Sequence, residues 1–333
     1  MSTALPGARG LFSILQDSLR KADRNRVRLT TRNWDTVADF RAIADSLSTR
    51  PTRLPELVPA DHAHYLGASD ACQRGMGGMW FDTTRTLGAP ILWRFEFPAS
   101  IRAAFVTATN PRGSVSISDL ELAALIAHKD ILAQYADVCE RTLWIATDNR
   151  AALTWSTKGS ATSTAARAYL LRYNALHQRE HRYVATHAHI AGKANVMADD
   201  ASRLWHLDDA MLLSHFDLTY PQASPWRMLT LKPSTSSTLI GALFRHRPQP
   251  GFQLNASIPL PGRGTCGWNS VPVSALTLPP CPASPSPSCK SSPSACAPAQ
   301  LHPAVDLSGL GQWKTLSAPL ARRMPAWGPW TLA

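Results

Sequence analysis

The sequence predicts an α/β fold in which helices flank a mixed sheet of five strands. Three strand-like segments come before the first long helix, and consecutive strands of this kind suit an antiparallel meander. Strand-like and helix-like segments then alternate, which extends such a sheet with parallel strands. After residue 245 the chain becomes rich in proline, serine and alanine, a composition that cannot bury a core. A disordered tail is therefore expected to follow the sheet.

The first 60 residues predict a short helical segment with too little apolar sequence to be a secure domain of its own. A basic connector at residues 21–28 is followed by apolar residues at helical spacing, which are Trp34, Val37, Phe40, Ile43 and Leu47. Prolines at positions 51, 55 and 59 then interrupt the chain.

Strands and helices can be assigned in order along the main domain, which we expect to span residues 61–207. Residues 65–71 predict the first strand, and a glycine-rich turn at residues 75–78 leads into the second strand at Met79. The third strand is expected at residues 91–97. The later elements are an amphipathic helix at 118–136, a strand at 141–147, helices between 151 and 181, a strand at 181–190 and a helix at 195–205 that Asn195 caps.

Two further segments complete the predicted organisation. Residues 208–248 are expected to form a short helical extension, because apolar residues recur near its end at helical spacing. Residues 249–333 are expected to be a low-complexity and mostly disordered tail. The tail contains a closing Trp-rich stretch, from Trp313 to Trp330, for which the sequence suggests no partner.

Charge and composition limit the function classes. The net charge of +11 and the pI of about 9.8 suit a partner with a phosphate backbone, although a basic surface or a basic tail explains them equally well. None of the six cysteines forms a CxxC pair, and no zinc-site spacing occurs. Without a secretory signal or an apolar run of membrane-spanning length, we expect an intracellular protein, cytoplasmic or nuclear, that has no membrane partner.

Four acidic residues stand out by their places on these elements, although each has a structural explanation. Asp70 could be a strand-end surface residue, and Glu121 could close a capping box with Ser118. Asp148 could cap the helix that follows it, and the helix dipole alone favours Asp199 in a first helical turn. Single acids therefore do not decide the function.

The four acids are more informative together. They occupy the first strand, the first long helix, the end of the fourth strand and the last helix of the main domain, so this fold could bring them to one sheet edge. Carboxylates at such short distances repel one another unless cations lie between them. Mg²⁺ or Mn²⁺ is the natural occupant, and two such ions can activate water and stabilise the leaving oxygen of a phosphodiester.

The short sequence motifs around these acids resemble those of a known family. Ser69-Asp70-Ala71 followed by Gly75-Met76-Gly77-Gly78 resembles the opening of the retroelement RNase H domain. Glu121-Leu122-Ala123-Ala124 and Thr147-Asp148-Asn149-Arg150-Ala151 resemble its next two motifs. The stretch from His189 to Arg203 is similar to the ending found in Gypsy-like and tyrosine-recombinase (DIRS-like) retrotransposons. The resemblance covers about residues 61–205, in the right order.

The resemblance implies an RNase H-like fold that cleaves the RNA strand of an RNA–DNA hybrid. By position, Asp70, Glu121, Asp148 and Asp199 would hold two Mg²⁺ or Mn²⁺ ions. His189 falls where cellular relatives carry a histidine that assists product release or proton transfer, although a strand histidine with no such role is the alternative. Phosphate contacts are expected from basic residues near the cleft, which are Arg74, Lys158, Arg167, Arg172 and Lys193.

The first 60 residues resemble the connection segment between polymerase and RNase H in such elements. A polymerase domain of the same element is therefore an expected partner. This chain itself offers no polymerase site, because Asp208-Asp209 lies in a helical context instead of a strand hairpin. The alternatives are an inactive retroelement remnant that binds nucleic acid or acts as a structural tether, and a segment linked to a recombinase whose catalytic set is not discernible in this sequence.

Overall fold

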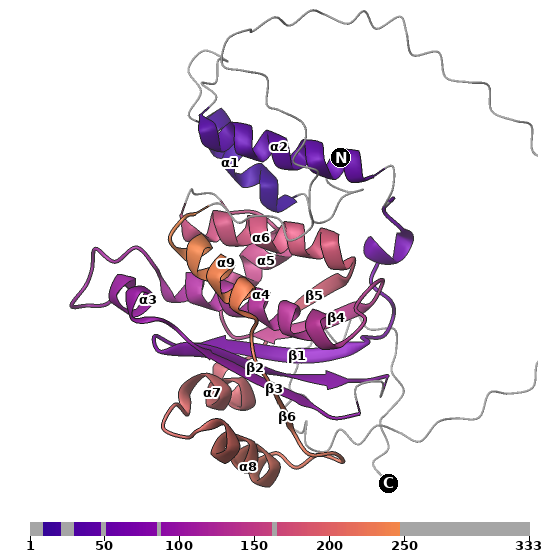
Figure 1. Ribbon diagram of the computed structural model, residues 1–333, viewed down its shortest axis with the longest axis vertical. Helices are drawn as coiled ribbons and strands as arrows, with labels where there is room; N and C mark the ends of the chain where they lie inside the picture. Colours follow the sequence, from indigo (N-terminus) through magenta and orange to yellow (C-terminus); the bar gives the residue numbers. More distant parts are fainter. Residues whose placement is uncertain (1–8, 21–29, 48–50, 85–87, 162–164, 247–333) are drawn as a thin grey trace, which may run out of the picture. The chain divides into compact units, whose positions relative to one another are not determined.

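One mixed sheet forms the centre of the fold in the residues that the computed structural model describes, which are 9–20, 30–47, 51–84, 88–161 and 165–246. Its six strands are β1 (Tyr65–Ala71), β2 (Gly75–Asp82), β3 (Ile91–Glu96), β4 (Thr142–Thr147), β5 (Val184–His189) and β6 (Arg227–Leu229). Their order across the sheet is β5-β4-β1-β2-β3-β6 (Figure 1). The predicted meander of β1, β2 and β3 is antiparallel, and β4 and β5 continue from β1 in parallel. The α/β class with a mixed sheet is therefore confirmed.

The described sheet has one strand more than the five predicted. β6 pairs in parallel with β3, so that Leu92 lies opposite Met228. Three residues are too few for a period-two pattern to be recognised, and the partner strand lies far away in the sequence. The predicted extension at residues 208–248 thus contributes a strand as well as two helices, α8 (Asp209–Thr219) and α9 (Pro233–Leu243).

Helices cover both faces of the sheet. Figure 1 shows α4 (Ile117–Tyr135), α5 (Arg150–Lys158), α6 (Ala166–His181) and α9 on one face, with α7 (Val196–Arg203) and α8 on the other. Alternation along β3 supplies both apolar layers, because Ile91 and Trp93 join the core under α4 while Leu92 joins the core under α7. The short helix α3 (Ala99–Ala104) follows β3.

The prediction that α4 is amphipathic is wrong. Every residue from Asp119 to Leu132 is buried, so this helix has no solvent face over that length. The sheet covers one side of α4, and α5, α6 and α9 pack on the rest of it. Because α9 lies about a hundred residues later in the chain, the local pattern of α4 could not reveal that it is covered.

The prediction of a glycine-rich turn at residues 75–78 is also wrong, because these residues begin β2. The chain reverses at residues 72–74 instead. A Cβ atom on Gly77 would lie 2.7 Å from the carbonyl carbon of Ala201, and one on Gly78 would lie 2.4 Å from the carbonyl oxygen of Ala68. Gly77 therefore allows the backbone of α7 to approach the sheet closely, while Gly78 lies against the backbone of β1.

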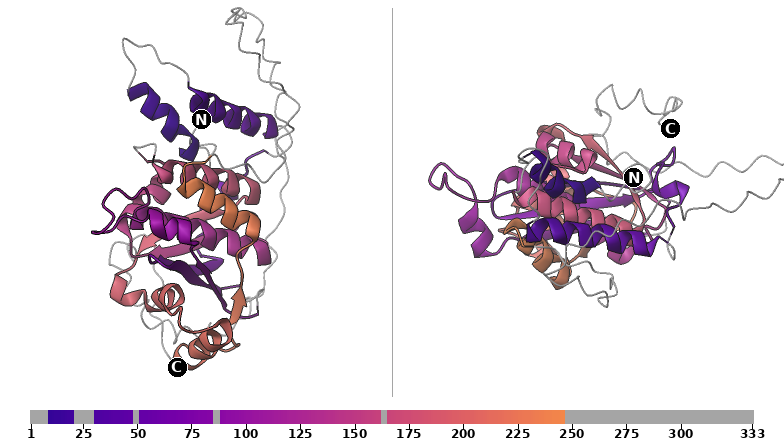
Figure 2. Two further views of the ribbon diagram at one scale, coloured as in Figure 1. Left: turned by 60° about the vertical axis from the view of Figure 1, so that its left-hand side comes forward. Right: turned by 90° about the horizontal axis from the view of Figure 1, so that it is seen from above.

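The N-terminal segment forms two helices, α1 (Arg9–Arg20) and α2 (Thr31–Ser46), and α2 confirms the helical spacing that begins at Trp34. Leu11 and Ile43 form a small apolar cluster with Ala175 of α6. A buried ion pair joins Asp39 of α2 to Arg172 of α6, with Nη2 donating to Oδ1 over 2.6 Å. Figure 2 shows α1 and α2 on the outer side of α6.

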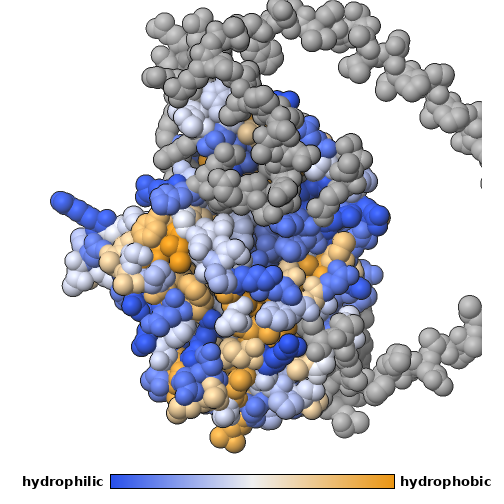
Figure 3. Space-filling view, in the orientation of Figure 1, coloured by the Kyte–Doolittle hydropathy of each residue, from blue (hydrophilic) through white to orange (hydrophobic). Residues whose placement is uncertain are grey.

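Among the described residues, no helix is both long enough and apolar enough to cross a membrane. On the face drawn in Figure 3, apolar residues lie in small groups between hydrophilic ones. The basic connector at residues 21–28 and the predicted tail at 249–333, with its Trp-rich end, lie outside the described residues.

Candidate metal centre

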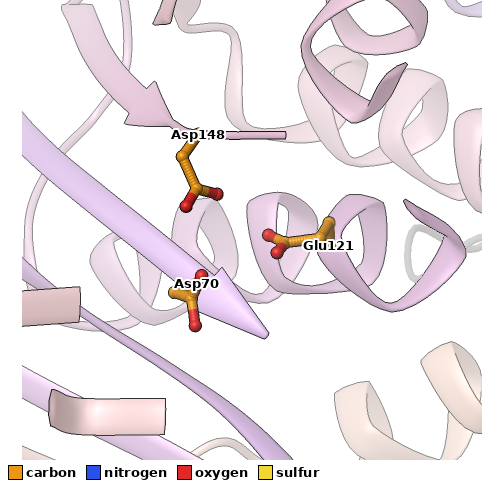
Figure 4. A group of neighbouring side chains, drawn as sticks. All are labelled: Asp70, Glu121 and Asp148. Atoms are coloured by element: carbon orange, nitrogen blue, oxygen red, sulfur yellow. The ribbon is translucent and has the colours of Figure 1, made fainter. Parts of the chain in front are cut away.

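Three carboxylates from separate elements meet at one edge of the sheet. Asp70 is near the end of β1, and Asp148 directly follows β4, which runs parallel beside β1. Carboxyl ends of neighbouring parallel strands reach the same edge, where ligands bind in open α/β sheets. Glu121, near the start of α4, completes the group, and one oxygen of each residue lies within 4.8 Å of the others (Figure 4).

Glu121 does not form a capping box with Ser118, which was the structural explanation that the sequence offered. The helix α4 begins two residues earlier than such a box requires, and Ser116 is its N-cap. Asp119 occupies the matching position, since its Oδ2 accepts from the Ser116 amide over 3.0 Å. Glu121 instead turns into the buried edge of the sheet, where it is 4% exposed and the Ala71 amide donates to it.

Asp148 is not a helix cap either. Asn149 is the N-cap of α5, and its Oδ1 accepts from the amides of Ala151 and Ala152 over 3.1 and 3.0 Å. The Asp148 carboxylate is therefore available to the group that it forms with Asp70 and Glu121 (Figure 4).

Burial and mutual repulsion disfavour the charged form of all three carboxyl groups. Burial, with the charges of Asp70 and Asp148, raises the pKa of Glu121 to about 10. Burial also raises the pKa of Asp70 to about 6, and it raises that of Asp148. Oε2 of Glu121 is buried and has no hydrogen-bond partner among the described residues. A bound divalent cation would supply the missing partner and reverse these pKa shifts, so the three residues fit one hard metal ion.

Binding of Mn²⁺ to the full chain at pH 7 is expected to release about one proton. Glu121 is protonated at that pH in the metal-free chain and must ionise to become a ligand. At pH 5.5 Asp70 is also largely protonated, so the release should rise towards two protons and the affinity should fall. Titration calorimetry in buffers of different ionisation enthalpy measures the number of protons released. Binding at pH 7 without proton release, or an equal release from Glu121→Gln, would contradict the prediction.

Asp199, the fourth predicted ligand, does not lie in the three-residue group. It is in the first turn of α7, and its carboxylate forms an ion pair with Arg203 one turn later. The side chain of Asp199 is 42% exposed. Its charge nevertheless contributes to the raised pKa values of Asp70 and Asp148, so it lies beside the group.

Ser202 belongs to the site and was missed by sequence reasoning. Its hydroxyl donates to Oδ2 of Asp70 over 2.6 Å, and both side chains are buried. The available signal was its spacing, because Ser202 follows Asp199 by about one helical turn and so reaches the same side of α7.

His189 and Asn195 lie near the group. His189 ends β5, and its Nε2 is 3.1 Å from the carbonyl oxygen of Asp148. Because a carbonyl oxygen only accepts, Nε2 is the donor in this bond. Asn195 is at the N-cap position of α7 as predicted, but it makes no side-chain cap, and its Nδ2 donates instead to the Ser69 carbonyl over 3.5 Å.

The basic residues predicted to contact phosphate differ in their exposure and in their partners. The prediction is wrong for Arg172, because this residue is 2% exposed and is paired with Asp39. Arg74 is exposed and pairs with Glu96 over 3.0 Å, while Arg167 lies 4.6 Å from the centre of the Trp155 ring. The two predicted lysines are exposed, at the end of α5 and just before α7, and they are Lys158 and Lys193.

Comparison with models of protein families gives no match to this chain, and comparison with the sequences of curated proteins gives none either. A function must therefore be inferred from the residues of the site and from their geometry.

Proposed function

We propose that this chain is a metal-dependent ribonuclease H, which hydrolyses the RNA strand of an RNA–DNA hybrid. The observation that carries the proposal is the group of three carboxylates, one from β1, one from α4 and one from the end of β4. Neither Glu121 nor Asp148 caps a helix, so a capping role does not explain why these two acids are present. Three of the four acids in the stretches that resemble retroelement RNase H motifs are thus among the residues that meet in space, and Asp199 is the exception.

Asp70, Glu121 and Asp148 would hold one Mg²⁺ or Mn²⁺ ion, and a second ion would require Asp199 to leave Arg203. When bound, such ions supply the positive charge that activates a water and stabilises the leaving oxygen of a phosphodiester. An ion pair as exposed as that of Asp199 and Arg203 contributes well under about 1 kcal/mol, so exchanging it costs little. His189 is held beside the group by its bond to Asp148 and is our candidate for proton transfer or product release.

The substrate follows from charge and from the chemistry of the cut. The chain carries a net charge of +11, which favours a polyanion. Exposed cations flank the carboxylates along the chain, because Arg150 follows Asp148 and Lys193 precedes α7. An enzyme that cuts only RNA can test the 2′-hydroxyl in the shallow minor groove of an A-like hybrid. A polymerase domain of the same retroelement is the proposed protein partner, next to the helical N-terminal segment.

A second candidate function is binding of nucleic acid without cleavage, as in an inactive retroelement remnant. The pairing of Asp199 with Arg203 favours it, because three carboxylates instead of four then face one another. In that case the basic surface would still bind the hybrid, while its RNA strand would stay intact.

Cleavage of a labelled RNA–DNA hybrid by the full chain separates these functions. With Mg²⁺ we expect the RNA strand to be cut, the DNA strand and free single-stranded RNA to be spared, and EDTA to stop the reaction. Glu121→Gln should lower the rate at least about 100-fold because it removes a ligand. Glu180→Gln on α6 is the matched control and should cleave like the wild type. A hybrid that is bound but not cut would support the inactive remnant and overturn the proposal.

A further inference from the structure

The hydroxyl of Ser202 is the only side-chain group among the described residues that is seen to donate a hydrogen bond to Asp70. Both residues are almost completely buried, at 0% and 2% exposure. The bond joins Oγ of Ser202 to Oδ2 of Asp70 over 2.6 Å, the short distance that is typical of a hydroxyl donating to a carboxylate. A second acceptor, the Asp199 carbonyl, lies farther from the same hydroxyl, at 3.1 Å. The single hydroxyl proton therefore goes to Asp70.

Ser202 is itself fixed from the other side. Its carbonyl oxygen accepts from the thiol of Cys72 over 3.0 Å and from the indole nitrogen of Trp205. Cys72 follows β1 directly, so this bond ties Ser202 to the strand that carries Asp70. The helix α7 also packs closely against β2, because the backbone of Ala201 lies next to Gly77. The serine hydroxyl thus has little freedom to move away from the carboxylate.

We propose that Ser202 is a positioning residue, which holds Oδ2 of Asp70 by its hydroxyl and so presents the carboxylate to a divalent cation shared with Glu121 and Asp148. The inference rests on the metal-binding part of the proposed function. A ligand carboxylate with a fixed hydrogen bond needs no reorientation when the ion binds. Loss of such an outer partner weakens metal binding by about 10–100-fold in characterised sites.

The test is the affinity of the full chain for Mn²⁺, measured by calorimetry at pH 7, with hybrid cleavage measured in parallel. Ser202→Ala should weaken Mn²⁺ binding about 10–100-fold. The matched control is Ser156→Ala, because Ser156 is also a buried helix serine and its hydroxyl bonds to His187 over 2.8 Å instead of to a carboxylate. This control should bind Mn²⁺ within about twofold of the wild type, since no ligand loses its partner.

A second variant covers a failure of Ser202→Ala to fold. Ser202→Cys, kept reduced, fills the site with a slightly larger side chain of the same shape but offers only a weak donor, so its Mn²⁺ affinity should also fall. Melting curves without metal establish that each variant is folded. Equal Mn²⁺ affinity in the wild type and in either folded Ser202 variant would overturn the positioning role, even where cleavage is seen.

The outcomes also separate this inference from the proposed function. A wild-type chain that binds Mn²⁺ but cuts no hybrid, together with weaker binding by Ser202→Ala, would refute the ribonuclease and support the positioning role. A wild-type chain that binds no Mn²⁺ would overturn both.

Discussion

Replacing Asp70 with asparagine is expected to abolish cleavage of the RNA strand and to stabilise the metal-free chain. Asparagine offers one neutral amide oxygen instead of a carboxylate, so it is a poor ligand for Mg²⁺. The stability gain has a separate cause, since burial raises the pKa of Asp70 to about 6 in the folded chain. Ionising this buried group at pH 7 costs folding free energy, and the variant avoids most of that cost, about 2 kcal/mol.

The pH dependence of this gain identifies its origin. A carboxyl whose pKa is raised by folding destabilises the chain fully above the folded pKa, and the penalty is lost below the unfolded pKa. The advantage of Asp70→Asn should therefore be complete above about pH 6 and vanish near pH 4. Thermal melts in EDTA at both pH values measure it, with Asp137→Asn, an exposed aspartate, as the control. An unchanged or lower melting temperature at pH 7 would contradict the prediction.

Replacing Lys129 with methionine should also stabilise the chain. Lys129 lies in α4 and is 1% exposed, and its Nζ donates to Oδ1 of Asn174 over 2.6 Å. Burial lowers the pKa of this lysine from 10.5 to about 7. Near neutral pH, folding therefore costs about 4 kcal/mol more than it would if this lysine kept its ordinary pKa. Leaving Asn174 without its donor costs about 1–3 kcal/mol, so we expect a net gain of about 2 kcal/mol.

Lys129 predicts a pH slope as well. Above pH 7 the folded chain releases the lysine proton, while the unfolded chain keeps it up to about pH 10.5, so this residue makes stability rise with pH across that interval. The difference in unfolding free energy between the wild type and Lys129→Met should shrink from pH 7 to pH 10. Denaturant unfolding of both proteins measures it, with Lys158→Met, which replaces an exposed lysine, as the control. A difference that stays constant with pH would disprove the assignment.

The sequence alone predicted most of the elements, because each depends on a local pattern. Apolar alternation located β1, β3, β4 and β5, and helical spacing located α2 and α9. The positions of Asp70 and Asp148 at the ends of neighbouring parallel strands followed from the order of those elements. Their meeting with Glu121 was therefore predictable in outline, and the three are found together.

Only the tertiary structure decided which partner each polar group and each face has. Capping of α4 by Ser116 rather than Ser118 freed Glu121, and the ion pair with Asp39 took Arg172 away from the predicted phosphate contacts. Gly77 belongs to a strand because it pairs with β1 and β3, and its missing side chain leaves room for α7. Each of these outcomes depends on contacts between distant segments, and a local pattern carries no information about what will lie across from it. The residue types at the sheet edge came from the sequence, but the packing decided that Glu121 and Asp148 cap no helix and meet Asp70 instead.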